Sequence, residues 1–74
     1  MNALHVCWIT LTSFNGTYHN RTIVNVNDIT VMVDQETRCE RPNRTMVSFN
    51  DGKRFVCVEE FLVEIEQKIK ETCK

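Results

Sequence analysis

The 74-residue sequence predicts an α+β domain, in which a small, strongly twisted antiparallel sheet of about five strands precedes one C-terminal amphipathic helix. Two observations predict this class. Residues 5–58 contain short β-branched or alternating stretches that are separated by turn residues, whereas the apolar residues of 59–73 recur at the helical period. Because short sheets twist strongly, a barrel-like closure of the strands is the alternative to an open sheet. With residues 1–4 as a leader, the whole chain (1–74) forms a single domain.

The N-terminal half is expected to form three strands. Residues 5–14 alternate in polarity and end at Asn15-Gly16, a strong hairpin signal. β-branched runs at 22–26 and 29–34 predict the second and third strands, with a turn or a short helical turn between them. Antiparallel neighbours therefore follow one another along the chain.

The C-terminal half is expected to form a loop, a hairpin and a helix. The polar residues 35–44 contain the only proline and predict a mobile surface loop. Residues 45–49 and 55–58 flank a turn at Gly52, which accommodates positive φ. From residue 59 to residue 73, one helical face is apolar. The residues of that face expected to pack against the sheet are Leu62, Ile65 and Ile69.

The composition indicates a folded chain whose net charge does not favour any particular class of charged partner. Nine basic and ten acidic residues give a net charge of −1, which demands neither nucleic acid nor a membrane surface nor an acidic substrate. No apolar run approaches the roughly 20 residues of a membrane span. The first residues resemble no secretion signal, so a cytoplasmic location without membrane contact is expected.

The four cysteines are expected to be free thiols, because disulfides are rare in a reducing compartment. Three of them lie in apolar stretches and are expected to be buried, whereas Cys39 lies in the polar loop and is expected to react first. The alternative is a secreted domain with two disulfides. Three N-x-Thr sequons favour this alternative, and they begin at Asn15, Asn20 and Asn43.

No constellation of residues predicts catalysis, a metal or a cofactor. The cysteines and the two histidines, His5 and His19, lack the paired spacing of a zinc site. The carboxylates of residues 59–73 are most simply the solvated face of a helix, and both glycines belong to turns rather than to a phosphate-binding loop. We therefore expect a protein that is not an enzyme.

Two candidate contact surfaces remain. On the first strand, Ile9 and Leu11 share one face, while Trp8 and Phe14 lie on the other, which a single helix cannot also cover. Trp8 or Phe14 is therefore expected at a contact with a protein partner or with another copy of the chain, most simply in a two-fold dimer. In the barrel-like alternative, both sets are buried in one core.

The second candidate surface is basic. If the 35–44 loop lies near the hairpin turn at Gly52, five cations face one region, which can then hold an anion, a nucleic-acid backbone or an acidic partner. No aromatic-rich strand accompanies them for base stacking, so nucleic acid is the alternative to a protein partner. The five cations are Arg38, Arg41, Arg44, Lys53 and Arg54.

Four short motifs give the chain a family resemblance. They are ITLTSFNG at 9–16, VNVNDI at 24–29, TMVSFNDG at 45–52 and VCVEE at 56–60. They resemble the I-x-L-T-x-L-N-G, L-N-P-D-L-I, T-V-I-x-L-x-N-G and V-V-x-E-S segments of the small flagellar and swarming motility protein family. The similarity covers roughly residues 8–73, nearly the whole chain.

The resemblance implies a small cytoplasmic accessory protein without known catalytic residues. Similar short chains also occur as uncharacterised proteins of gut bacteria and phages, and this chain looks closer to them. Val26 stands where the family has a proline, and Glu60 stands where it has a helix-capping serine. The region after Gly16 and the 35–44 loop are longer, and the cysteines are not part of the pattern, so motility itself is not expected to transfer.

Overall fold

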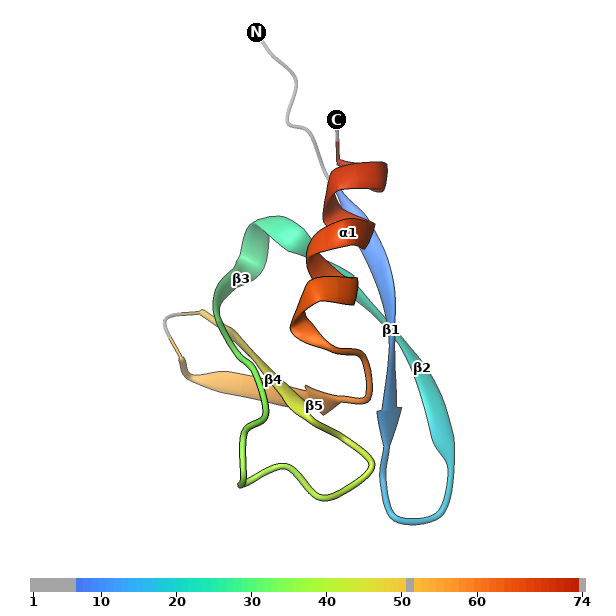
Figure 1. Ribbon diagram of the computed structural model, residues 1–74. Helices are drawn as coiled ribbons and strands as arrows, with labels where there is room; N and C mark the ends of the chain where they lie inside the picture. The colour runs from blue at the N-terminus through green and yellow to red at the C-terminus, as the bar shows by residue number, and fades with distance from the viewer. Residues whose placement is uncertain (1–6, 51, 74) are drawn as a thin grey trace, which may run out of the picture.

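The computed structural model describes residues 7–50 and 52–73 and has the expected α+β class (Figure 1). The elements are β1 (Trp8–Phe14), β2 (His19–Asn25), the 3₁₀ turn η1 (Val26–Asp28), β3 (Ile29–Val33), β4 (Thr45–Phe49), β5 (Arg54–Val58) and α1 (Leu62–Thr72). The leader at 1–4 and the first two residues of the expected first strand lie outside the described residues. Of the predicted strands, the second begins earlier than expected, because His19 already pairs with Phe14.

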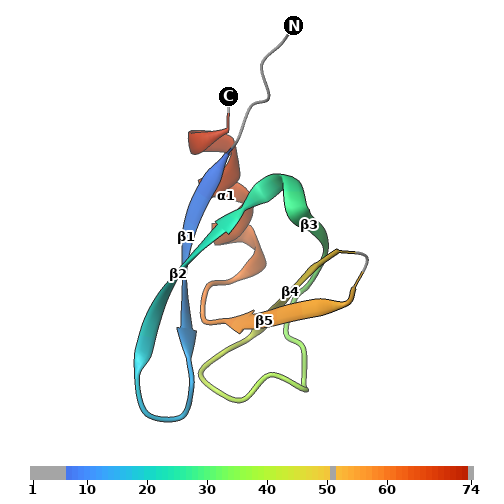
Figure 2. The same cartoon turned by 180° about the vertical axis from the view of Figure 1, so that it is seen from behind.

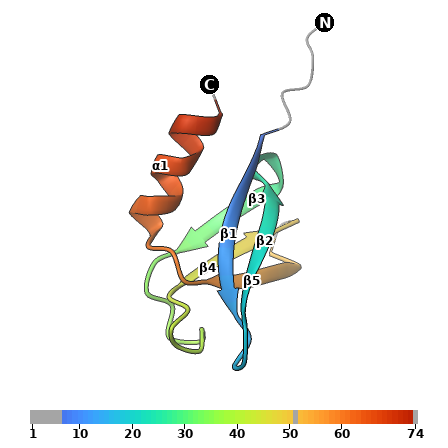
Figure 3. The same ribbon diagram turned by 90° about the vertical axis from the view of Figure 1, so that its right-hand side faces the viewer.

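The strands form two antiparallel sheets rather than the single sheet that was expected. One sheet contains β1 and β2, and the other has the order β3-β4-β5. The sheets are not closed on one another, so the structure does not support the barrel-like alternative. The Asn25 side chain accepts a hydrogen bond from the Asn27 N–H and starts η1, which turns the chain out of the first sheet before β3 begins. Figure 3 shows β1 and β2 running across the direction of β4 and β5.

The core lies between the two sheets and α1. Ile9 pairs with Val24 in register, so both point inward, as the alternation of the first strand predicts. Side chains from both sheets and from the helix join them, since the cluster consists of Ile9, Leu11, Val24, Val47, Val58 and Ile65. One small core therefore supports every surface of the molecule.

The helix is shorter at its N-terminus than the sequence predicts. It begins at Leu62, and the Glu64 carboxylate accepts a hydrogen bond of 2.8 Å from the N–H of Phe61, which precedes the first turn. Of the face expected to pack against the sheet, Ile65 is fully buried and Ile69 packs against the core. Leu62 is only half-buried and lies outside the core cluster, so Ile65 is the central contact of this helix.

All four cysteines form disulfides, so the prediction of free thiols with a reactive Cys39 is wrong. Cys7 bonds to Cys73 and joins the start of β1 to the end of α1, two segments that lie side by side in Figures 1 and 2. Cys39 bonds to Cys57 and joins the loop after β3 to β5. The Cα–Cα distances of 5.5 and 5.6 Å lie within the usual range for a disulfide. Sequence spacing does not specify this connectivity.

Candidate functional site

An apolar groove opens between the two sheets, where the strands diverge. Its volume is about 380 Å³, and Trp8, Ile23 and Phe55 line it with exposed fractions of 53%, 66% and 62%. Ile23 pairs with Thr10 on the outer face of the β1–β2 sheet, because its neighbour Val24 points into the core. The residues of β2 and the first residues of β5 lie on the side of the molecule away from α1 (Figure 3). The helix therefore leaves this groove uncovered.

One acidic and one basic side chain also line the groove. Asp28 comes from η1, and Arg54 comes from the first position of β5. Both are exposed, and neither forms an ion pair within residues 7–50 and 52–73. The groove consequently combines a large apolar area with one unpaired charge of each sign.

The two aromatic residues predicted as contacts do not lie together. Trp8 lines the groove, but Phe14 lies at the other end of β1, about 20 Å away along an extended strand. Phe14 is half-buried, and its ring lies 4.7 Å from the His19 ring between centroids. Sequence reasoning missed Ile23 and Phe55, although alternation already required one of Ile23 and Val24, and one of Phe55 and Val56, to face outward.

The five predicted cations fall into two groups. Arg54 pairs with Phe49, whereas Arg44 precedes Thr45 at the opposite end of β4, so the two arginines are separated by more than about 13 Å of strand. Lys53 lies with Arg54 beside the turn, and the other three cations belong to the loop at the far end. The five cations therefore do not form one surface.

The loop cations differ in their partners. The Arg38 guanidinium donates hydrogen bonds of 2.8 and 3.1 Å to the Glu36 carboxylate, and its backbone N–H donates a third. These contacts lower the pKa of Glu36 to about 2. Arg41 and Arg44 instead line an open cavity of about 930 Å³, together with Phe61. The Arg44 guanidinium lies over the Phe61 ring, 4.0 Å from its centroid.

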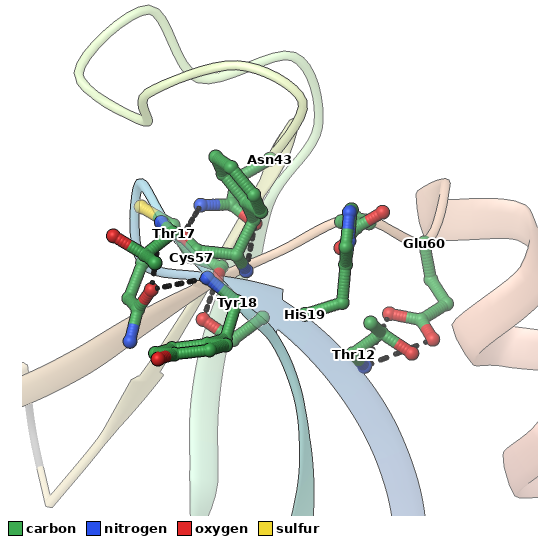
Figure 4. Close-up of polar contacts among 11 residues, drawn as sticks. Thr12, Thr17, Tyr18, His19, Asn43, Cys57 and Glu60 are labelled. Atoms are coloured by element: carbon green, nitrogen blue, oxygen red, sulfur yellow. Dashed lines mark hydrogen bonds and ion pairs between the residues drawn. The ribbon is translucent and has the colours of Figure 1, made fainter.

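Polar side chains hold β1 against the β4–β5 hairpin and its flanking residues (Figure 4). The Thr12 N–H donates to both carboxylate oxygens of Glu60, at 2.9 and 3.0 Å. The Asn43 side chain pairs with the Phe14 backbone as a strand would, accepting from its N–H at 2.9 Å and donating to its carbonyl at 2.7 Å. These groups are used in structural contacts, and none of them forms a nucleophile–base pair.

Glu59 also has a long-range partner, since its carboxylate lies 2.5 Å from the Nδ1 of His19. The two glutamates that the sequence assigned to the first helical turn therefore bind β1 and β2 instead. Within the described part of the chain, no three His, Cys, Asp or Glu side chains gather as a metal-ligand set. No helix in residues 7–50 and 52–73 has the length and apolar character needed to cross a membrane.

Comparisons with protein-family models, with curated proteins and with solved structures found no match.

Proposed function

We propose that this chain is a non-enzymatic protein-interaction module, and that its contact surface is the groove lined by Trp8, Ile23 and Phe55. The observation that carries the proposal is the convergence of these three exposed apolar side chains, from two different sheets, on one uncovered groove. Contiguous apolar surface of this kind is uncommon on monomers and is typical of binding sites. Fully burying one large apolar side chain contributes about 1.5–3 kcal/mol, so covering the exposed parts of these three side chains favours association.

A second copy of the chain is the proposed occupant. In a two-fold contact, a residue i that touches residue j of the partner implies that j also touches the partner's i. Asp28 and Arg54 line the same groove without ion-pair partners among the described residues, so in a two-fold contact Asp28 of each copy can pair with Arg54 of the other. A net charge of −1 adds little repulsion between copies.

Light scattering of the Trp8→Ser variant tests the proposal. The wild type is expected to be a dimer at high micromolar concentration and the variant a folded monomer, because Trp8 is half exposed and contributes little to the core. Tyr18→Ser is the matched control, since Tyr18 is an exposed aromatic residue outside the groove. A wild-type monomer contradicts self-association. Photo-crosslinking from position 23 in source cells then tests for a different protein partner.

The nucleic-acid alternative required five cations on one surface. Those cations lie at two ends of a hairpin, so the structure favours a protein partner over nucleic acid. The resemblance to small motility proteins supports an accessory role but names no partner. A cytoplasmic location conflicts with two disulfides, because cytosolic thiols are kept reduced. Alkylating the protein inside source cells before lysis decides the compartment: four modified cysteines indicate a reducing one, and none indicates an oxidising one.

A further inference from the structure

The loop after β3 has a fixed shape, although its composition predicts mobility. The Cys39–Cys57 disulfide joins its middle to β5, and the Asn43 side chain holds its end against Phe14. Within the loop, the Glu36 N–H donates to the Arg44 carbonyl at 2.9 Å. The cavity enclosed by this loop and Phe61 is therefore formed before any ligand arrives.

The cavity carries an excess of positive charge. Its charged lining residues are Glu36, Arg41 and Arg44. Arg38 neutralises Glu36 through two side-chain hydrogen bonds, which leaves the other two guanidinium groups uncompensated. Neither Arg41 nor Arg44 forms an ion pair within residues 7–50 and 52–73. Two unpaired guanidinium groups therefore face one open space.

Arg44 has an unusual environment for a cation. It is half-buried, its guanidinium plane rests on the Phe61 ring, and its Nε is buried without a hydrogen-bond partner. Buried polar groups nearly always have such a partner, so the unpaired Nε is unusual in a folded protein. Stacking on Phe61 also restricts the side chain, which lowers the entropy lost when an anion binds.

We propose that this cavity binds a phosphate monoester, whose phosphoryl oxygens are held by Arg41 and Arg44. A phosphate monoester carries a charge of about −1.5 to −2 at neutral pH, which matches two guanidinium groups better than a single carboxylate does. The guanidinium fork also matches phosphoryl geometry. A volume of about 930 Å³ exceeds the needs of the phosphoryl group alone and leaves space for the organic part of the ester.

Titration of the ¹⁵N-labelled full chain tests this site with three probes: inorganic phosphate, glucose 6-phosphate and a phosphoserine peptide. Chemical-shift changes are expected at Arg41, Arg44 and Phe61, and the tightest probe identifies the source of the phosphoryl group. Arg41→Gln is expected to weaken binding at least about tenfold, because it removes charged hydrogen bonds. Arg41 has an exposed side chain, so this variant is expected to fold normally.

Two control variants make the result specific. Arg21→Gln removes an exposed cation from β2, and Lys53→Gln removes one beside the β4–β5 turn. Both are expected to bind the phosphate ester as the wild type does. No shift change with any probe overturns the proposal, as does equal weakening in Arg21→Gln and Arg41→Gln, which indicates nonspecific attraction. Because the groove is not involved, light scattering of Arg41→Gln is expected to match the wild type whether or not the self-association proposal holds.

Discussion

The two ends of the β4–β5 hairpin carry surfaces of opposite character. Near Arg54 lies the apolar groove, which regular strands form simply by alternating their side chains between two faces. Near Thr45 lies the cationic cavity, whose walls depend on a disulfide and on side-chain contacts to the backbone of a distant strand. The groove therefore depends on the two sheets, whereas the cavity also depends on a disulfide and on side-chain hydrogen bonds that can be removed one at a time.

The largest expected effect damages both surfaces together. Ile65 is fully buried where α1 meets the two sheets, so Ile65→Ala is expected to reduce the free energy of unfolding by about 2–5 kcal/mol. Leu62→Ala is the matched control, and its effect is expected to be smaller because Leu62 is half-buried outside the core cluster. Urea unfolding followed by circular dichroism measures both. Equal losses would contradict the assignment of Ile65 as the central helix contact.

The sequence predicts the elements of this fold well and their arrangement poorly. Alternation and turn residues identify each strand, because these signals are local. The predicted start of α1 was wrong. The side chains of Glu59 and Glu60 form hydrogen bonds with His19 and Thr12, which lie 40 and 48 residues away, and the helix begins after them. Local helix rules contain no information about partners at that separation.

The candidate site shows the same limit. Trp8 was expected at a contact surface because one helix cannot cover both faces of a strand, and it lines the groove. The five cations were expected to face one region if the 35–44 loop lay near the turn, but a hairpin separates its two ends by the full length of its strands. Cysteine pairing could not be derived, since four cysteines allow three connectivities.

The second effect is expected to separate the two surfaces. Replacing Cys39 and Cys57 with alanine removes a disulfide that closes a loop of 18 residues. This loss is expected to lower the free energy of unfolding by about 3 kcal/mol. The freed loop is expected to lose binding of phosphate esters, while the groove still supports association. Calorimetry with a phosphate ester and light scattering of the same sample measure the two properties.

The alanine pair at Cys7 and Cys73 is the control for that experiment. Its disulfide spans 66 residues, so its loss is expected to destabilise the fold more, but neither of its cysteines belongs to the loop. At a temperature where both variants are folded, the control is expected to retain binding of the phosphate ester. Loss of that binding in both variants would show that the cavity depends on global stability rather than on its own anchor.

The smallest expected effect uses acid to perturb only the loop. Hydrogen bonds from Arg38 hold the pKa of Glu36 at about 2, below its ordinary value of 4.5. A lowered pKa in the folded state stabilises the fold above the ordinary value, and this stabilisation is lost as the pH falls from about 4.5 toward 2. In Glu36→Gln this contribution is absent at every pH, so the difference in unfolding free energy between wild type and variant is expected to shrink over that range.

Because the pair is exposed to solvent, the difference is expected to be small at neutral pH and smaller still at high salt. The groove contains no part of this pair, so the extra acid sensitivity is expected in the NMR signals of the loop and not in those of Trp8 or Ile23. A difference that stays constant between pH 5 and pH 2 would contradict the ion pair between Glu36 and Arg38. The Glu36 carboxylate would then be available to offset the charges of Arg41 and Arg44.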